Sequence, residues 1–274
     1  MSYACRRWSP SLSRPWVLAL PGALSPGRFH ARLGAAVLGA IAAVVWCFVP
    51  VISAVARASG DPSNQASYYK GLLGFLATQD PTRGRLEIPF TREHWEAAYV
   101  APAFPIARGW ERQLDNAYNA QLYRPLTAST YRQWLDASAV DLVAIPDVPL
   151  DYGGVAERDV LAHPPDYLTE VYRDAHWRVY RVSDPTPMVT GPATLTSLGP
   201  TSMTLDFDTP GVATVKVHAS TLWKTDSDAA CIDGRSKTWL AVEASEPGAV
   251  TLTTGMSVAS VLQHSSTACD SDGD

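Results

Sequence analysis

The sequence predicts an α+β protein in which one transmembrane helix is followed by an exterior α/β domain and a small β-sandwich. Three observations lead to this fold class. Residues 33–55 form a long apolar run without charges, residues 67–184 mix helical and strand patterns, and short Thr- and Val-rich runs follow Pro185. The predicted boundaries are a basic tail (1–32), the membrane helix (33–56), the α/β domain (57–184), the sandwich (185–264) and an acidic tail (265–274).

The first predicted element is the run Leu33–Val55, 23 residues with no charged side chain. At 1.5 Å per residue it spans roughly 34 Å, which is enough to cross the hydrocarbon core of a bilayer. Eleven of its residues are Leu, Ile, Val or Phe. Each of these favours insertion by about 0.3–0.6 kcal/mol at the middle of the membrane, so we expect a membrane-spanning helix.

Charge is distributed unequally on the two sides of this run. Residues 1–56 hold five arginines and no acid, whereas the other 218 residues hold 17 Lys and Arg against 27 Asp and Glu. Short basic segments stay on the cytoplasmic side of a cell membrane, so the N-terminus is expected inside and the C-terminal domain is expected to be extracytoplasmic. The acidic exterior also argues against nucleic acid as a partner, because phosphates require a basic patch.

A cleaved secretory signal is the alternative to an anchor. The tripeptide Ala54-Val55-Ala56 has the small residues that precede a cleavage site. Two lengths argue against cleavage. The apolar run exceeds the usual signal core of about 7–15 residues, and 32 residues precede it. The anchor is the favoured interpretation, and both place the bulk of the chain outside the cytoplasm.

The cysteines agree with an oxidising exterior. Cys47 lies within the apolar run and Cys5 on its cytoplasmic side, which leaves Cys231 and Cys269 as the exterior pair. An oxidising compartment permits a disulfide between them, and we favour that interpretation. The alternative is two free thiols that lie too far apart to meet.

Residues 67–184 contain signals for helices and for strands. Tyr68–Leu76 has the spacing of a helix with one buried face, and Thr127 is a candidate N-cap for a helix that carries Tyr131, Trp134 and Leu135. The predicted strands are 84–90, 140–145 and a hairpin of 169–172 with 176–182.

The composition changes at Pro185. Five short runs follow that are rich in Thr and Val and are separated by Gly, Pro, Asp or Ser: Ala193–Leu198, Ser202–Phe207, Val212–His218, Thr238–Ala244 and Ala249–Thr254. Because no helical period separates them, this spacing is typical of a β-sandwich.

Three motifs in the sequence have spacings that are found in catalytic or metal sites. Gly255–Ala259 resembles a nucleophile elbow, but only His264 follows it and no acid lies between Ser257 and that histidine. Asp206/Asp208 and Asp226/Asp228 have the DxD spacing, yet two carboxylates supply only part of the oxygen shell of a hard cation. With no zinc spacing or phosphate-binding glycine loop either, we predict no metal, no cofactor and no catalytic residue.

The strongest candidate binding site is a cluster of aromatic and charged residues in the α/β part. Sugar sites pair an aromatic platform for the apolar sugar face with charged groups for the hydroxyls. The candidate glycan-binding residues are Trp95, Glu96, Arg108, Trp110 and Glu111. The alternative is that both tryptophans pack in the core or between domains and that the charges are surface caps.

Four segments carry a resemblance to a known group of proteins: Gly84–Tyr99, Ala107–Asp115, Asp141–Asp151 and Ala175–Tyr180. They resemble the exterior C-terminal region of large multi-pass membrane proteins of actinobacteria, which are similar to lipid-linked-sugar glycosyltransferases of the GT-C type. The resemblance covers about residues 65–262 and implies an α/β-plus-β exterior domain. The catalytic loop of those enzymes has no counterpart here, so no catalytic residue is carried over. A shortened member, a partner that supplies only the exterior domain, and a misplaced start codon all fit this difference.

The sequence therefore predicts a single-pass protein of the cell envelope whose exterior domain is a non-catalytic binding or accessory module. Its expected partners are membrane lipid, glycan and a multi-pass membrane protein that packs on the small residues around Gly34 and Gly39. One alternative is a component of a lipid-linked-sugar glycosyltransferase, and another is a secreted β-rich binding module.

Overall fold

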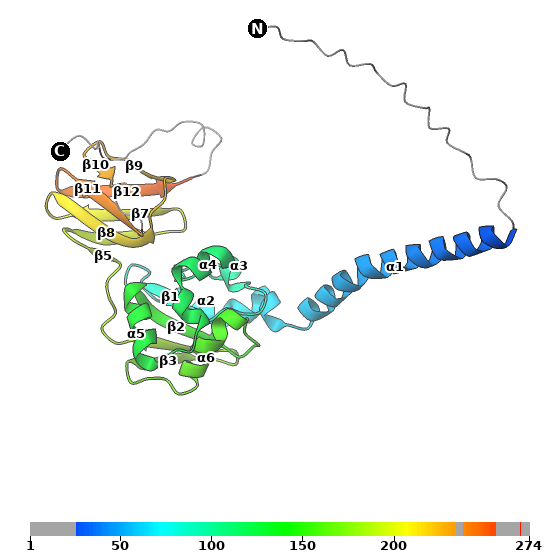
Figure 1. The fold of residues 1–274 in the computed structure, drawn as a ribbon. Coiled ribbons are helices and arrows are strands. Elements are labelled where there is room, and N and C mark those ends of the chain that lie inside the picture. The colour runs from blue at the N-terminus through cyan, green and yellow to red at the C-terminus, as the bar shows by residue number, and fades with distance from the viewer. Residues whose placement is uncertain (1–25, 234–237, 256–268, 270–274) are drawn as a thin grey trace, which may run out of the picture. The chain divides into compact units, whose positions relative to one another are not determined.

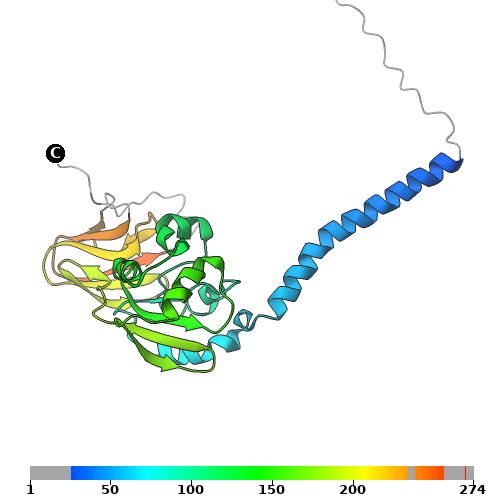
Figure 2. The ribbon, with the colours of Figure 1, turned by 60° about the horizontal axis from the view of Figure 1, so that its bottom comes forward.

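The computed structural model describes residues 26–233, 238–255 and 269. Within these ranges the chain is mixed α+β, with one apolar N-terminal helix and three β-sheets (Figures 1 and 2). It divides into two compact units, residues 1–57 and 58–274. Most of the predicted basic tail and nearly all of the predicted acidic tail lie outside the described residues.

Helix α1 (Pro26–Ser59) contains a stretch, His30–Ala56, of 27 residues with mean hydropathy 2.5. At 1.5 Å per residue this stretch is about 40 Å long. Its large apolar side chains are exposed all round the helix, as expected of a segment that requires an apolar environment. The hydroxyl of Ser53 donates to the carbonyl of Pro50 at 2.8 Å, so this polar group is paired within the helix. The helix is long and apolar enough to cross a membrane.

The second unit begins with short helices. Asp61 caps η1 (Pro62–Asn64) by accepting a hydrogen bond from the backbone N–H of Ser63 at 3.0 Å. The helix predicted over 68–76 is confirmed, divided into η2 (Ala66–Tyr69) and α2 (Lys70–Leu76). It buries Tyr68, Tyr69, Leu72 and Leu76.

A mixed four-stranded sheet forms the centre of the first half of this unit. Its strand order is β1 (Arg85–Glu87), β2 (Val140–Pro146), β4 (Trp177–Val182) and β3 (Leu168–Arg173). The pair β1–β2 is parallel and the others are antiparallel. Gly84 lies just before β1, where a Cβ would lie 2.9 Å from the carbonyl oxygen of Ala139. Any larger residue at this position would therefore push β1 away from β2.

Both faces of this sheet are covered, which explains why all seven residues of β2 are buried. Leu142 and Ala144 pack with α2, whereas Val143 and Ile145 pack in a second core. That second core contains Tyr131, Trp134 and Leu135 of α5 (Ala128–Ala137) and Leu161 of α6 (Val155–Leu161). Alternate side chains of a strand point to opposite faces, so burial on both faces favours apolar residues along β2. The exception is Asp141, which is buried and accepts from Arg181 at 2.7 Å.

The predicted cap of α5 is confirmed, because the Thr127 side chain accepts from the backbone N–H of Thr130 at 3.2 Å. Like η1, five other short helices were not predicted from the sequence. These are α3 (Glu96–Tyr99), α4 (Arg112–Tyr118), η3 (Ala120–Tyr123), η4 (Tyr152–Gly154) and α6. Each is at most seven residues long, too short for a helical period to stand out.

The second half of the unit consists of two antiparallel sheets that share one core. The first has the order β10 (Ala230–Ile232), β11 (Trp239–Ala244), β8 (Gly211–His218) and β5 (Val189–Thr190). The second has the order β6 (Ala193–Leu198), β7 (Ser202–Phe207), β12 (Gly248–Thr254) and β9 (Trp223–Thr225). All five predicted strands are confirmed to within one residue at each end, and the three missed strands have only two or three residues.

The boundary predicted between residues 184 and 185 falls inside the 58–274 unit, and several contacts cross it. The ammonium of Lys216 on β8 donates to the carbonyl of Asp136 at the end of α5, at 2.7 Å. Arg132 of α5 donates to the carbonyl of Ser183 at 2.7 Å. Ala139 packs in the core of the two β-sheets rather than in the cores of the mixed sheet.

Candidate functional site

The structure separates the five candidate glycan-binding residues into a buried and an exposed set. Glu96 and Arg108 are only 2% and 3% exposed, so the prediction that they face a glycan is wrong. Trp95 and Trp110 are 41% and 64% exposed, so neither tryptophan lies in the core. Glu111 caps α4, because its carboxylate accepts from the backbone N–H of Leu114 at 3.0 Å.

Arg108 is the centre of a buried polar cluster. It follows a segment that runs beside β1, where the N–H of Ala107 donates to the carbonyl of Leu86 at 2.8 Å. The guanidinium donates twice to Asp115, from Nε at 3.0 Å and from Nη2 at 2.7 Å. It also donates from Nη1 to Glu157 at 2.6 Å, and Glu87 lies 3.5 Å from the same nitrogen.

The remaining faces of this guanidinium are occupied by protein as well. It lies over the ring of Phe90 at 3.8 Å from the centroid, and it donates to the carbonyl of Gly153 at 3.2 and 3.3 Å. The hydroxyls of Tyr123 and Tyr131 donate to Asp115 and Glu157 respectively. The cluster therefore joins β1, α4, α5 and α6 inside the unit, with no face left for a ligand.

The surroundings shift the pKa values of these acids in opposite directions. Burial alone would raise the pKa of Asp115, but hydrogen bonds and charge attraction from Arg108 outweigh it and the pKa is lowered. Burial and the neighbouring carboxylate of Glu157 raise the pKa of Glu87 well above its ordinary value. Glu87 thus tends to keep its proton, which reduces the excess of negative charge around one arginine.

Glu96 belongs to a second polar group, nearer the surface. It accepts a short hydrogen bond from the hydroxyl of Thr91, and its other oxygen lies 3.7 Å from Nδ1 of His94. His94 has a positive φ of 58°, and its Nε2 accepts from Arg112 at 3.3 Å. Arg112 in turn donates to both oxygens of Asp151 at 3.1 Å.

These contacts bring together two loops that each carry an exposed tryptophan. Trp95 follows His94 directly, and Trp110 precedes Arg112 by two residues. Trp95 stacks on Tyr99 with ring centroids 5.5 Å apart, so its ring is held by the protein. Arg112 lies over the exposed ring of Tyr152 at 4.5 Å. We call Trp95, Trp110, Arg112 and Tyr152 the aromatic surface.

The charge at the aromatic surface is fixed by Asp151. Its hydrogen bonds raise the pKa of Arg112. Burial opposes ionisation of Asp151, but the hydrogen bonds from Arg112 and from the N–H of Gly153 lower its pKa overall. Both groups are therefore charged at neutral pH, with Arg112 partly exposed and Asp151 mostly covered.

Sequence reasoning missed the roles of His94, Arg112 and Tyr152 at this surface. Arg112 and Asp151 are 39 residues apart, and no spacing in the sequence links them. The only signal was the density of aromatic and charged residues in 94–96 and 108–112, which pointed to the correct loops.

The two DxD pairs lie on the sandwich. Asp206 and Asp208 are exposed near the end of β7, as expected for a solvent-facing edge. Asp226 has a structural role, because its carboxylate accepts a hydrogen bond from the backbone N–H of Thr251 at 2.9 Å. Residues 256–259 and His264 of the elbow-like motif lie outside the described residues.

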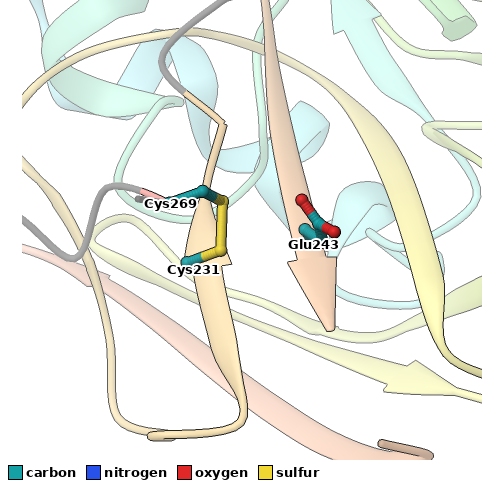
Figure 3. Close-up of side chains that lie close together, drawn as sticks. All are labelled: Cys231, Glu243 and Cys269. Atoms are coloured by element: carbon teal, nitrogen blue, oxygen red, sulfur yellow. A yellow bond between two sulfur atoms is a disulfide. The ribbon is translucent and has the colours of Figure 1, made fainter. Parts of the chain in front are cut away.

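The predicted pair Cys231 and Cys269 is joined by a disulfide with its Cα atoms 4.9 Å apart (Figure 3). The backbone N–H of Cys269 also donates to the carbonyl of Ile232 at 3.0 Å, which holds this part of the chain along β10. The carboxylate of Glu243 on β11 lies within 4.8 Å of both sulfurs. Because the sulfurs are bonded to each other, the trio does not supply thiolates to a metal. Cys5 lies outside the described residues.

No family model matches the chain, and neither a curated protein nor a solved structure matches it. The similarity to the exterior region of GT-C-like membrane proteins therefore stays a prediction.

Proposed function

We propose that this protein is a membrane-anchored binding module of the cell envelope, with its basic N-terminus in the cytoplasm and residues 58–274 outside. The observation that carries the proposal is helix α1, whose stretch His30–Ala56 is long, apolar and exposed on all sides. The excess of arginine before this stretch and of acid after it supports the orientation. The disulfide is of the kind that persists in an oxidising compartment.

We further propose that the aromatic surface binds glycan. The apolar face of a sugar ring packs on an indole ring, and a guanidinium donates to hydroxyl groups. Trp95, Trp110 and Tyr152 supply exposed rings, and Arg112 is held between Asp151 and Tyr152 in a fixed orientation. A fixed donor loses less conformational entropy on binding than a free side chain, so this arrangement favours recognition.

The anchor and its orientation are tested first. Full-length protein should stay in the membrane fraction after carbonate extraction, and its mass should include residues 1–56. Protease added to intact spheroplasts should degrade the 58–274 unit and spare the N-terminus. A Val44→Arg/Val45→Arg variant should enter the membrane poorly, since each arginine costs about 2.5–3.5 kcal/mol at the helix centre. Mature protein that lacks residues 1–56 would instead support the secreted module.

Glycan binding is tested separately on arrays of envelope glycans. Trp95→Ala, Trp110→Ala and Arg112→Met should each weaken binding. Leu114→Ala is the matched control, because Leu114 is a large apolar residue of α4 that is 55% exposed and lies outside the aromatic surface. Unchanged binding in both tryptophan variants would exclude this surface as the glycan site.

A second candidate function is that of an accessory subunit for a multi-pass glycosyltransferase. Gly34 and Gly39 favour it, because a Cβ at either position would meet nothing within 4 Å and a partner helix has room to approach. Gly34→Leu/Gly39→Leu should then abolish co-purification of a multi-pass protein, whereas Leu38→Ile should not. Equal recovery with all variants would argue against docking through this part of α1.

A further inference from the structure

The 58–274 unit contains a pocket that is distinct from the aromatic surface. Its volume is about 370 Å³, within the range of about 300–1,000 Å³ that is typical of small-molecule sites. Most of the residues that line it are apolar by type, proline and methionine among them, and the surface that they present is polar and apolar in about equal parts. The residues that matter for the argument are Arg85, Phe104, Ile106, Leu198, His218 and Trp223.

Arg85 is the unusual member of this wall. It is only 7% exposed, yet among the described residues its guanidinium makes no ion pair and no hydrogen bond, and burial is the one influence on its pKa. The guanidinium lies over the ring of Trp239, 5.7 Å from its centroid. A buried charge without a counter-charge is strongly unfavourable, so proteins rarely keep one without a purpose.

Two neighbouring basic groups, Lys216 and His218, lie within the field of this charge. Burial lowers the pKa of Lys216, and the positive charge of Arg85 lowers it further against the attraction of Asp136. Burial and Arg85 likewise lower the pKa of His218. Burial lowers the pKa of Arg85 itself to about 10, so the guanidinium stays charged at neutral pH.

The side chains next to Arg85 are held in place before any ligand arrives. The ring of His218 is stacked between Tyr118, at 3.9 Å, and Trp239, at 4.9 Å. Its Nδ1–H donates to the carbonyl of Thr238 at 3.2 Å, which orients the ring. The wall of the pocket thus contains the guanidinium of Arg85 and the oriented ring of His218, together with apolar side chains such as Phe104, Ile106 and Leu198.

We propose that this pocket binds a small anionic amphiphile, whose carboxylate or phosphate pairs with Arg85 and whose apolar part lies against Phe104, Ile106 and Leu198. A guanidinium presents its donors in the planar fork that matches these two anions. The anionic group of the ligand would then be the counter-charge of Arg85. This site shares no residue with the aromatic surface, so it stands whether or not that surface binds glycan.

The test uses the full-length protein in nanodiscs of zwitterionic lipid, with empty nanodiscs as blank. The probes are hexanoate, hexyl phosphate, inorganic phosphate and hexanol, and binding is followed by calorimetry and by the melting temperature. At least one of the two hexyl anions should bind and raise the melting temperature, and the tighter of them identifies the head group. Hexanol and inorganic phosphate should each bind more weakly, because each lacks one half of the recognised structure.

Two variants locate the site. Arg85→Met should weaken binding of the hexyl anion by about tenfold to a hundredfold, the usual effect of losing a hydrogen bond to a charged group. It should melt no lower than the wild type without ligand, because it removes an unpaired buried charge. Gly109 lines the pocket and has open space at its Cβ position, so Gly109→Leu should fold normally and obstruct binding. Arg158→Met, at an exposed arginine on α6, is the control.

The proposal is overturned if neither hexyl anion binds, or if hexanol binds as tightly as both. It is also overturned if inorganic phosphate matches hexyl phosphate, since the apolar wall would then contribute nothing. Finally, Arg85→Met with undiminished binding, or with a lower melting temperature and no anion effect in the wild type, would assign Arg85 a purely structural role.

Discussion

Arg108 and Arg85 are two buried arginines of the same unit with opposite surroundings. Arg108 meets three carboxylates, a backbone carbonyl and an aromatic face, and the protein satisfies it completely. Arg85 meets one aromatic ring and a pocket, with no acid at ion-pair distance among the described residues. Burial alone therefore does not distinguish an arginine with a structural role from one that binds a ligand. The two are distinguished by whether the protein supplies a counter-charge.

The largest expected effect is the loss of Arg108. Arg108→Met leaves Asp115 and Glu157 buried without their cation, which typically costs about 3–5 kcal/mol in the free energy of unfolding. Arg85→Met should cost nothing or stabilise. Denaturant unfolding of the two full-length variants measures the difference. Equal losses would mean that Arg85 has a protein counter-charge after all, and the contrast would disappear.

Removing the disulfide tests whether the half with the mixed sheet and the half with the sandwich unfold together. Cys231 and Cys269 are 38 residues apart in sequence. Closing a loop of that size stabilises by about 3–4 kcal/mol in the chain-entropy model. Cys231→Ser/Cys269→Ser should therefore lower the same single transition that Arg108→Met lowers. Two separate transitions would show that the mixed sheet and the sandwich unfold independently.

Asp115→Asn weakens the Arg108 cluster more gently. The amide keeps the shape but loses the charge that accepts from Arg108 twice, with an expected loss of about 1.5–3 kcal/mol. Because the folded pKa of Asp115 is lowered, its contribution is complete above the ordinary pKa and is lost as pH falls through the folded pKa. Stability measured from pH 7 down to pH 2 should show wild type and variant converge. A constant gap would contradict the assignment.

Glu87→Gln should act in the opposite direction along the pH axis. The folded pKa of Glu87 is raised, so the folded state holds a proton that the unfolded state releases above its ordinary pKa. Wild-type stability from this group therefore falls as pH rises toward the folded pKa. The glutamine variant should gain on the wild type as pH rises above the ordinary pKa of a glutamate, because glutamine has no proton to release. A gain that is largest at low pH would reverse the sign and exclude a retained proton.

The smallest effect is expected at the surface. Arg158 contacts Asp159 at 2.9 Å, with both side chains more than half exposed. Exposed pairs contribute about 0–1 kcal/mol, so Arg158→Met should change the free energy of unfolding by less than about 0.5 kcal/mol. A larger loss would mean that arginine substitution on α6 disturbs packing, and Arg158→Met would no longer be a fair control.

Local patterns were sufficient for much of the fold. Thr127 predicted the start of α5, the largely apolar run Val140–Ile145 predicted β2, and the Thr- and Val-rich runs predicted five sandwich strands. Strands β5, β9 and β10 escaped notice because two or three residues carry no period, and their hydrogen-bond partners lie far away in the sequence. The short helices of 96–123 were missed because four to seven residues are too few for a helical period to stand out.

The candidate site was predictable only as a region. The density of tryptophan and charge selected the loops around Trp95 and Trp110, but it could not say which charges were internal. Glu96 and Arg108 are buried because Thr91 and Glu157 lie against them, and the latter partner is 49 residues from Arg108. The role of Arg85 could not be predicted, because nothing in the local sequence distinguishes one arginine in a short strand from another.

The sequence by itself determined the long apolar helix, the distribution of charge about it and the alternation that makes the strands, because each is a property of neighbouring residues. Only the tertiary structure decided which charges meet a counter-charge. That outcome depends on distances between residues far apart in the chain, and the free energy of a buried charge depends on those distances more than on its own identity.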